Sequence, residues 1–319
     1  MLKYCLKRLL IVIPTFLGIT IMVYVLASLA PGSPVEMLFA NAGGALSAEA
    51  FAQMEAQLGL DQPVIIQYFH WLGGILQGNL GTSYRTMQPV ASMLAERIGP
   101  TLLLSVTALV MALLAAVPLG IAAACKPYSV WDYVSSGLSF LGAAMPNFFA
   151  AMILIYVFCI KLNILPTGGM WDSGGVHTVG VLACHLLLPA ITLMIQYLGA
   201  FTRQTRSSML EVLNEDFVRT ARAKGLMEDK VVLRHALRNA LIPLVTQIGL
   251  SLPVLIGGAV VTEQIFGWPG MGSLMVTSIN FRDYPVIMGI TVLIALFVLV
   301  GNIVIDLIYG LLDPRIVRT

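Results

Sequence analysis

Charge is scarce in this sequence. Only 11% of the 319 residues are charged, 18 of them basic and 16 acidic, whereas 58% are hydrophobic and the mean hydropathy is +0.89. Soluble globular domains carry about 25% charged residues, so this shortage excludes an ordinary soluble domain. We therefore expect an integral membrane protein, with membrane lipid around it.

Motifs for nucleotide hydrolysis and for common hydrolases are also missing. The sequence contains no GxxxxGK[ST] phosphate-binding loop, no HExxH zinc motif and no GxSxG nucleophile elbow. We therefore predict no catalytic residue, no metal site, no cofactor held by the chain and no ATP hydrolysis by the chain itself. The isolated His185 is expected to be a hydrogen-bonded packing residue instead of a catalytic base.

Long hydrophobic runs recur along the chain. Six runs are long enough to cross a hydrocarbon core about 30 Å thick, which takes ~20 helical residues. They comprise residues 9–30, 101–124, 137–160, 180–202, 240–262 and 285–309. The first run exceeds a signal-peptide core, and Pro31 follows its one candidate cleavage site, so we expect a retained helix. The sequence predicts an all-α membrane protein with six transmembrane helices.

Lys and Arg indicate the orientation of these helices. Fourteen of them lie in the N-terminal stretch, in segments 125–136 and 203–239 and in the C-terminal tail, against four in the alternate segments. If the long segment 31–100 is left out of the count, 14 Lys and Arg residues lie in the first set of segments against 2 in the alternate set. Because bases resist translocation, both termini are predicted to be cytoplasmic.

Ionisable residues are nearly absent from the predicted spans, where only His185 and Asp306 occur. Ion-coupled carriers usually keep such residues at membrane depth. Energy for uphill transport would then come from a partner, and an ion-coupled carrier or a channel is the alternative class. The four cysteines, Cys5, Cys125, Cys159 and Cys184, have neither paired nor metal-ligand spacing, and we expect buried thiols.

Residues 203–239 gather eight bases and five acids. The pattern predicts a helix over 208–224 that ends at Gly225, a second helix over 228–239, and a new span beginning at Pro243. Two helices joined by a tight turn suit a protein partner, and a positively charged anchor on anionic lipid is the alternative. We call residues 208–239 the docking segment.

Two stretches around this turn, RTARAKGL at 219–226 and HALRNALIP at 235–243, are the most specific motifs. The other landmarks are RLLIVIPTFLGIT (8–20), PGSP (31–34), LGLDQP (58–63), GNLGTS (78–83), MPNF (145–148), EQIFGWPGMG (263–272), RDYP (282–285) and DPR (313–315). Together they resemble inner-membrane permease subunits of binding-protein-dependent ABC importers, in the dipeptide, oligopeptide and nickel branch. The resemblance covers essentially the whole chain.

The resemblance implies a type I ABC importer permease fold. Residues 1–100 would form an N-terminal helix and a long periplasmic segment, and residues 101–319 a five-helix core with an EAA-type coupling loop at about 203–239. Gly225 takes the loop's glycine, while the residues at the EAA positions and the spacing to Pro243 depart from the general pattern, as in the peptide and nickel branch. The implied ATPase-coupling residues are Arg219, Thr220, Ala221, Arg222, Ala223, Lys224, Gly225 and Leu226.

The resemblance also implies the partners. They are a second homologous permease that completes a heterodimer, two cytoplasmic ATPases that bind ATP and Mg, and a periplasmic or extracellular solute-binding protein, with no nucleic acid. The expected function is import of dipeptides or oligopeptides across a bacterial inner membrane by a multi-pass subunit, and nickel or a metal chelate is the alternative cargo. His177 and His185 are eight residues apart and Met is scattered, which disfavours bare metal.

Two sets of residues are further candidate sites. Gln247, Ser251, Gly258 and Thr262 fall on one helical face and are predicted to line the translocation path, with helix packing as the alternative.

Phe266, Trp268, Pro269 and Gly270 are predicted to form an outer gate, with a compact turn as the alternative. Outside the membrane, the pattern predicts a helix that ends at Gly59 and another that starts at Pro63, where a binding protein docks or where aromatic residues pack at the interface.

Overall fold

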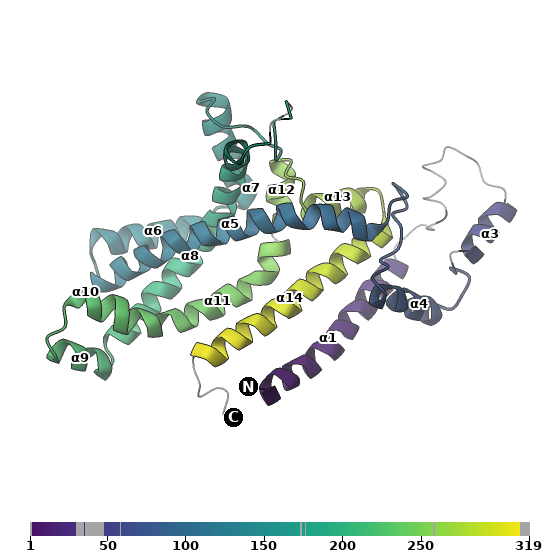
Figure 1. Ribbon diagram of the computed structural model, residues 1–319. Helices are drawn as coiled ribbons and strands as arrows, with labels where there is room; N and C mark the ends of the chain where they lie inside the picture. Colours follow the sequence, from purple (N-terminus) through teal and green to yellow (C-terminus); the bar gives the residue numbers. More distant parts are fainter. Residues whose placement is uncertain are drawn as a thin grey trace. The chain divides into compact units, whose positions relative to one another are not determined.

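The structure, a computed structural model, describes residues 2–29, 35, 48–57, 59–172, 174–175, 177–257 and 259–312. Within these residues the chain is helical apart from turns and one isolated bridge between Thr82 and Pro89 (Figure 1), which confirms the all-α prediction. The helices are α1 (Leu2–Ser28), α3 (Ala48–Gln57), α4 (Val64–Leu76), α5 (Val90–Cys125), α6 (Val130–Ala144), α7 (Asn147–Leu154), the π-helix η1 (Ile155–Lys161), α8 (Val179–Leu213), α9 (Asp216–Ala223), α10 (Glu228–Lys230), the π-helix η2 (Val231–Ala236), α11 (Leu237–Gly257), α12 (Ala259–Ile265), α13 (Met271–Asn280) and α14 (Tyr284–Leu312).

The chain folds as two compact units. The first comprises Met1–Pro100 with Gly270–Ile303, and the second comprises Thr101–Pro269 with Val304–Thr319. The long helices α5 and α14 contribute to both. The division of the sequence into 1–100 and 101–319 stays a prediction.

In the first unit, α4 packs against α1. The Thr20 and Tyr68 hydroxyls lie 3.0 Å apart, and the Tyr24 hydroxyl donates to Gln67 at 3.0 Å. Helix α3 is followed by Gly59 with φ +67°, and α4 begins directly after Pro63. These bounds confirm the two helices that the sequence predicts on either side of the LGLDQP stretch.

The 81–89 loop of the same unit is fixed by a buried carboxylate. Asp283, which is 2% exposed, accepts hydrogen bonds from the Ser83 hydroxyl and from the Tyr84 backbone N–H at 3.0 Å. The link between Ser83 and Asp283 cannot be predicted from the sequence, because 200 residues separate the two side chains. Burial and the nearby Asp283 carboxylate raise the pKa of the Tyr84 phenol to about 12.

In the second unit, small residues let helices approach closely. Leu104, Ala108, Ala112 and Ala116 recur every four residues along α5 and are all 0% exposed. Where α6 crosses α8, a Cβ at Gly142 would lie 2.6 Å from the Ile195 carbonyl oxygen. A Cβ at Gly199 would lie 2.6 Å from the Ser139 carbonyl oxygen. Backbone therefore contacts backbone at this crossing, as is common between membrane helices.

The predicted span over 137–160 is not one uninterrupted helix. Helices α6 and α7 are bent by 106° relative to each other at Met145 and Pro146. Met145 is extended, with ψ of 119°, because proline disfavours helical backbone in the residue before it. Pro146 is extended, with ψ of 139°, as the N-cap residue of α7.

Four helices of the described residues are long and apolar enough to cross a membrane, or five elements if the bent pair is one span. They are Leu10–Ser28, Val90–Cys125, Val179–Leu213 and Tyr284–Ile305. The stretch predicted as the fifth span is divided between α11 and α12. A count of six spans stays a prediction.

The helices predicted within the docking segment are also corrected. Residues 208–213 are the end of α8, and the helix is interrupted at Asn214 and Glu215 before α9 begins. Helical structure that begins at Glu228 continues through Pro243 to Gly257, so Pro243 does not open a span. Proline is tolerated inside membrane helices, as Pro14 and Pro189 are in α1 and α8.

The cysteine prediction holds for one thiol. Cys159 is buried, whereas Cys125 and Cys184 are exposed, which corrects the expectation of buried thiols. All three are free.

Candidate functional site

Gly225 forms the turn that joins the two halves of the docking segment. It follows the last residues of α9 with φ +77°, and its N–H donates to the Arg222 carbonyl at 2.9 Å. The Lys224 N–H donates to the Thr220 carbonyl at 3.1 Å. A glycine in the left-handed region just after a helix is the usual helix C-terminal cap, so the expected position of the turn is confirmed.

A hydrophobic cluster holds both sides of this turn. Val218 and Ala221 of α9 pack with Val231 and Val232 of η2, and all four are buried. The cluster also includes Ala124 at the end of α5, Met209 in α8, and Ala236 and Ala240 toward α11. The turn is therefore attached to the ends of three long helices of the second unit.

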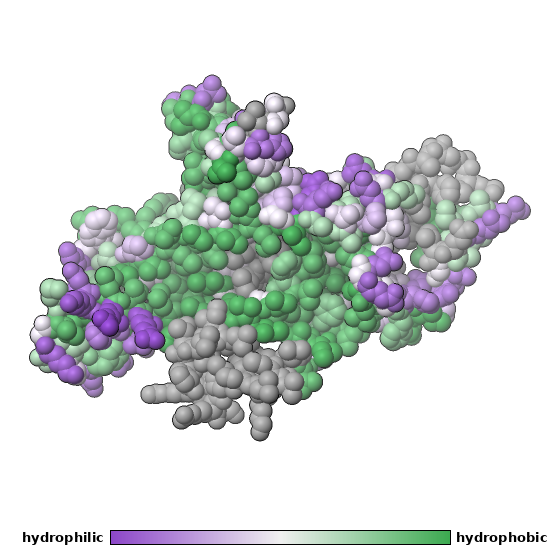
Figure 2. All heavy atoms as spheres, viewed as in Figure 1, coloured by the Kyte–Doolittle hydropathy of each residue, from purple (hydrophilic) through white to green (hydrophobic). Residues whose placement is uncertain are grey.

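The opposite face of the docking segment is exposed and strongly polar. Figure 2 shows hydrophilic side chains gathered over α9 and α10, at one end of largely hydrophobic helices. Hydrophobic side chains interrupt this polar surface: Phe217 is 41% exposed, Met227 65% and Leu233 59%. Mixed charged and apolar exposure is typical of a surface that binds protein.

An ion pair closes the turn. The Arg222 guanidinium donates to both carboxylate oxygens of Glu228, at 2.7 and 3.1 Å, across Gly225. This hydrogen bonding lowers the pKa of the Glu228 carboxyl and raises the pKa of Arg222. Both side chains are exposed, so the pair contributes little free energy but orients the turn.

The predicted coupling residues divide into two faces. Ala221 points into the hydrophobic cluster, whereas the other seven predicted residues are exposed. Thr220 donates to the Asp216 carbonyl at 2.9 Å, and Arg219 approaches the Asp216 carboxylate at 3.4 Å. The surface residues are therefore Arg219, Thr220, Arg222, Ala223, Lys224, Gly225 and Leu226.

The predicted path residues lie on two helices. Gln247 and Ser251 belong to α11, and the Ser251 hydroxyl donates to the Gln247 carbonyl at 2.8 Å. Thr262 belongs to α12 and is 0% exposed, while Gly258 lies outside the described residues. Thr262 therefore contacts protein in this structure, and a shared face of all four residues stays a prediction.

Three of the predicted gate residues, Phe266, Trp268 and Pro269, belong to the second unit, whereas Gly270 belongs to the first. Trp268 is 0% exposed within a cluster that includes Leu104 and Tyr197. Phe266 is 1% exposed, and its carbonyl accepts from the Gly169 N–H at 2.7 Å. Pro269 is half-buried and Gly270 buried. The indole thus holds the loop in the interior of the second unit.

Two further buried carboxylates, besides Asp283, are not predicted by the sequence. Glu263 is 0% exposed and accepts a hydrogen bond from the Thr101 hydroxyl at 2.7 Å, which fixes the chain just before the Trp268 loop. Asp132 accepts two hydrogen bonds from Arg206, at 2.6 and 3.0 Å, and so links α6 to α8. Each acid lies next to a predicted span but far in sequence from its partner, so no spacing rule reveals the pair.

His185 has the packing role that the sequence predicts. It is 6% exposed, and its Nδ1 lies 3.1 Å from the Gly168 carbonyl while its Nε2 lies 3.0 Å from Asp172. In the part of the chain that the structure describes, no three His, Cys, Asp or Glu residues are grouped as metal ligands.

The chain matches two protein-family models. Residues 116–318 match the binding-protein-dependent transport system inner membrane component, and residues 1–108 match the N-terminal family of binding-protein-dependent transport system membrane components.

Full-length relatives carry related descriptions. The oligopeptide transport system permease protein AppB of Bacillus subtilis is 44% identical over 317 residues, and the dipeptide transport system permease protein DppB of Escherichia coli is 40% identical over 339 residues. The glutathione transport system permease protein GsiC of Salmonella typhi is 42% identical over 316 residues. Each alignment covers 99% of both chains.

The fold is similar to solved transporter structures. An inward-facing structure of the MetNI methionine ABC transporter has a TM-score of 0.56 at 16% identity, covering 69% of this chain and 96% of that chain. At this identity the similarity concerns the fold alone.

Proposed function

This chain belongs to the family of binding-protein-dependent transport system inner membrane components, and from that premise we propose that it translocates peptides as one permease subunit of an ATP-driven ABC importer. It is a multi-pass inner-membrane protein. The family consists of transporter permease subunits, so the chain itself is not an enzyme.

The Gly225 turn is the observation that supports ATP-driven transport most directly. Buried valines hold α9 and η2 against the ends of three long helices, while Arg219, Lys224 and Leu226 remain exposed. In our proposal a cytoplasmic ATPase binds this surface, and closure of the ATPase pair moves the attached helices between inward- and outward-facing states. ATP and Mg would bind to the ATPases.

Orientation and span number follow the distribution of bases. We propose six spans with both termini in the cytoplasm, where the docking segment can meet an ATPase. The long segment 31–100 and the region 263–285 would then face the outside, where a solute-binding protein docks. A second, homologous permease would complete the path.

Within this scheme, Gln247, Ser251, Gly258 and Thr262 are the proposed path residues. Thr262 would come to line the path only after α12 moves, because it is fully buried here.

The outer-gate proposal has to accommodate a buried indole. Phe266, Trp268, Pro269 and Gly270 would close the outer mouth as part of the packed loop, and opening would require the loop to leave its cluster. The loop acts in this proposal as a plug that is fixed by Glu263.

Peptides are the proposed cargo because AppB, DppB and GsiC are described as permeases for oligopeptides, dipeptides and glutathione. Import of nickel or a metal chelate is the alternative cargo. The described residues contain no group of metal ligands, so a metal would have to cross as a chelate.

Reconstitution tests the proposal. We expect the chain, a second permease, two ATPases and a binding protein to import a labelled dipeptide into vesicles that contain ATP, and omission of the ATPases to stop uptake. Transport by the purified chain alone, driven by an ion gradient, would instead establish the ion-coupled carrier.

A further inference from the structure

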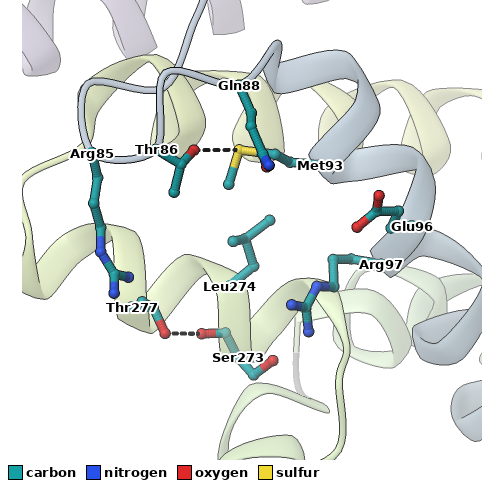
Figure 3. Close-up of a pocket in the computed structure, with 9 residues that line it drawn as sticks. All are labelled: Arg85, Thr86, Gln88, Met93, Glu96, Arg97, Ser273, Leu274 and Thr277. Carbon is teal, nitrogen blue, oxygen red and sulfur yellow. Dashed lines mark hydrogen bonds between the residues drawn. The ribbon is translucent and has the colours of Figure 1, made fainter.

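The first unit contains a small polar pocket that the proposed function leaves unexplained. It lies between the 81–89 loop, the first turns of α5 and helix α13, and its volume is about 250 Å³ (Figure 3). Arg85 enters from the loop, Glu96 and Arg97 from α5, and Ser273, Leu274 and Thr277 from α13.

Two guanidinium groups in the pocket have no carboxylate partner among the described residues. Arg85 lies over the Phe281 ring, 3.9 Å from its centroid, and neither Arg85 nor Arg97 forms an ion pair among the residues that the structure describes. Glu96 forms none there either. The pocket therefore carries a net charge of about +1 when both arginines and the glutamate are ionised.

The hydroxyl groups of the pocket already donate inside the protein, which leaves the two guanidinium groups and the Gln88 amide as its hydrogen-bond donors. Thr277 donates to the Ser273 carbonyl at 2.9 Å, Ser273 to the Gly270 carbonyl at 2.8 Å, and Thr86 to the Met93 sulfur at 3.6 Å. Each hydroxyl proton is thus used inside the protein. A ligand that satisfies the pocket must accept hydrogen bonds and carry negative charge, which describes a carboxylate.

Size and exposure favour a carboxylate that is presented by a protein. Pockets for small molecules usually measure about 300–1,000 Å³, and this one is smaller. Arg85 is exposed, while Arg97 is half-buried. One acidic side chain can enter such a site, whereas most of a peptide would remain outside it.

We propose that this pocket receives an acidic side chain of the solute-binding protein when that protein docks on the outer face of the permease. The proposal rests on the proposed function and on its orientation, which places α13 and the start of α5 outside the membrane. Arg97 is the central contact, and Arg85 extends the basic site toward the partner. Charge pairs of this kind raise association rates and depend on salt.

The test measures binding of the peptide-loaded binding protein to the complete transporter in nanodiscs. Arg97→Gln should weaken binding by about fivefold to thirtyfold, and Arg85→Gln by less because Arg85 is exposed. Both variants should flatten the dependence of Kd on salt. Arg282→Gln, at an arginine of the same unit that does not line the pocket, is the matched control and should bind like the wild type.

Charge reversal identifies the partner group. Arg97→Glu should abolish docking, and exchange of one acidic residue on the binding protein for Lys should restore it. Co-purification of the ATPases shows that each variant still assembles.

Three results would overturn the proposal. Wild-type affinity and salt dependence in the Arg85→Gln/Arg97→Gln double variant would exclude a role for the pocket. If the variants impaired uptake of free-acid peptides but not of C-terminally amidated ones, with docking intact, the pocket would bind the peptide's own carboxylate. If no binding protein stimulated the wild-type transporter, the proposed function itself would fail, together with this inference.

Discussion

Gly225 gives the sharpest test of the docking segment. At φ +77° an L-residue is strained by about 1–2 kcal/mol, and a β-branched side chain is strained further. No atom lies within 4 Å of the Cβ that a substitution would add, so the cost comes from the backbone and not from crowding inside the chain. For Gly225→Val, about 2 kcal/mol reduces the population of the native turn about thirtyfold.

The surrounding packing should survive this change. Val218 and Val231 are both 0% exposed, and full burial of one such side chain contributes about 1.5–3 kcal/mol. Their combined burial exceeds the strain at Gly225. We therefore expect α9 and η2 to stay packed while the turn between them shifts, so that the permease inserts but no longer couples to its ATPase.

The assay compares Gly225→Val with Gly225→Asn, because asparagine tolerates the left-handed region. At equal membrane levels, the Val variant should lose uptake and ATPase co-purification, while the Asn variant should keep most of both. Normal uptake by the Val variant would refute the requirement for positive φ. Equal loss in both variants would indicate that the partner excludes any side chain at this position.

Three further predictions follow from the same structure. The Arg222→Gln/Lys230→Gln double variant should reduce uptake less than Gly225→Val, because exposed ion pairs contribute only ~0–1 kcal/mol each. Loss of the membrane topology of this double variant in a labelling assay would instead support the lipid-anchor alternative. Trp268→Ala removes a fully buried indole and should destabilise the second unit by about 3–5 kcal/mol. The variant should also raise ATPase activity in the absence of binding protein while uptake falls, and Trp268→Phe should have smaller effects. A normal melting temperature and normal uptake in Trp268→Ala would contradict the gate proposal. Because the pKa of Glu228 is lowered in the folded chain, its ion pair with Arg222 should be fully present above the ordinary carboxyl pKa of about 4.3 and be lost as pH falls through the lowered value. Glu228→Gln should therefore remove an acid-induced change in ATPase co-purification below that ordinary pKa and should change nothing at pH 7.

Local signals in the sequence identified the parts of the fold that depend on local chemistry. The turn at Gly225 and the helix after Pro63 follow from single residues whose backbone preferences dominate their surroundings. The lone His185 was also interpreted correctly, because a buried imidazole needs partners and the nearby loop supplies carbonyl groups.

The failures have a physical cause as well. Pro146 bends the predicted third span whereas Pro243 lies inside a continuous helix, and proline alone does not decide between these outcomes in a membrane protein. The contacts of Asp283 with Ser83 and of Glu263 with Thr101 join residues that are far apart in the chain. Only the packed structure brings these partners together, so hydropathy and spacing could not predict them.

The crossing of α6 and α8 also determines where the backbone of the second unit can bend. With no side chains between the two backbones at Gly142 and Gly199, these helices cannot slide past each other without collision, and the Asp132–Arg206 pair stops them from pivoting apart. The helices α6 and α8 therefore move together as one rigid unit. The backbone next to this pair of helices can bend at the extended residues Met145 and Pro146, where the helical hydrogen-bond pattern is interrupted. A load applied through α8 would therefore move α6 with it, and the angle between α6 and α7 would change at Met145 and Pro146, so the bend acts as a hinge.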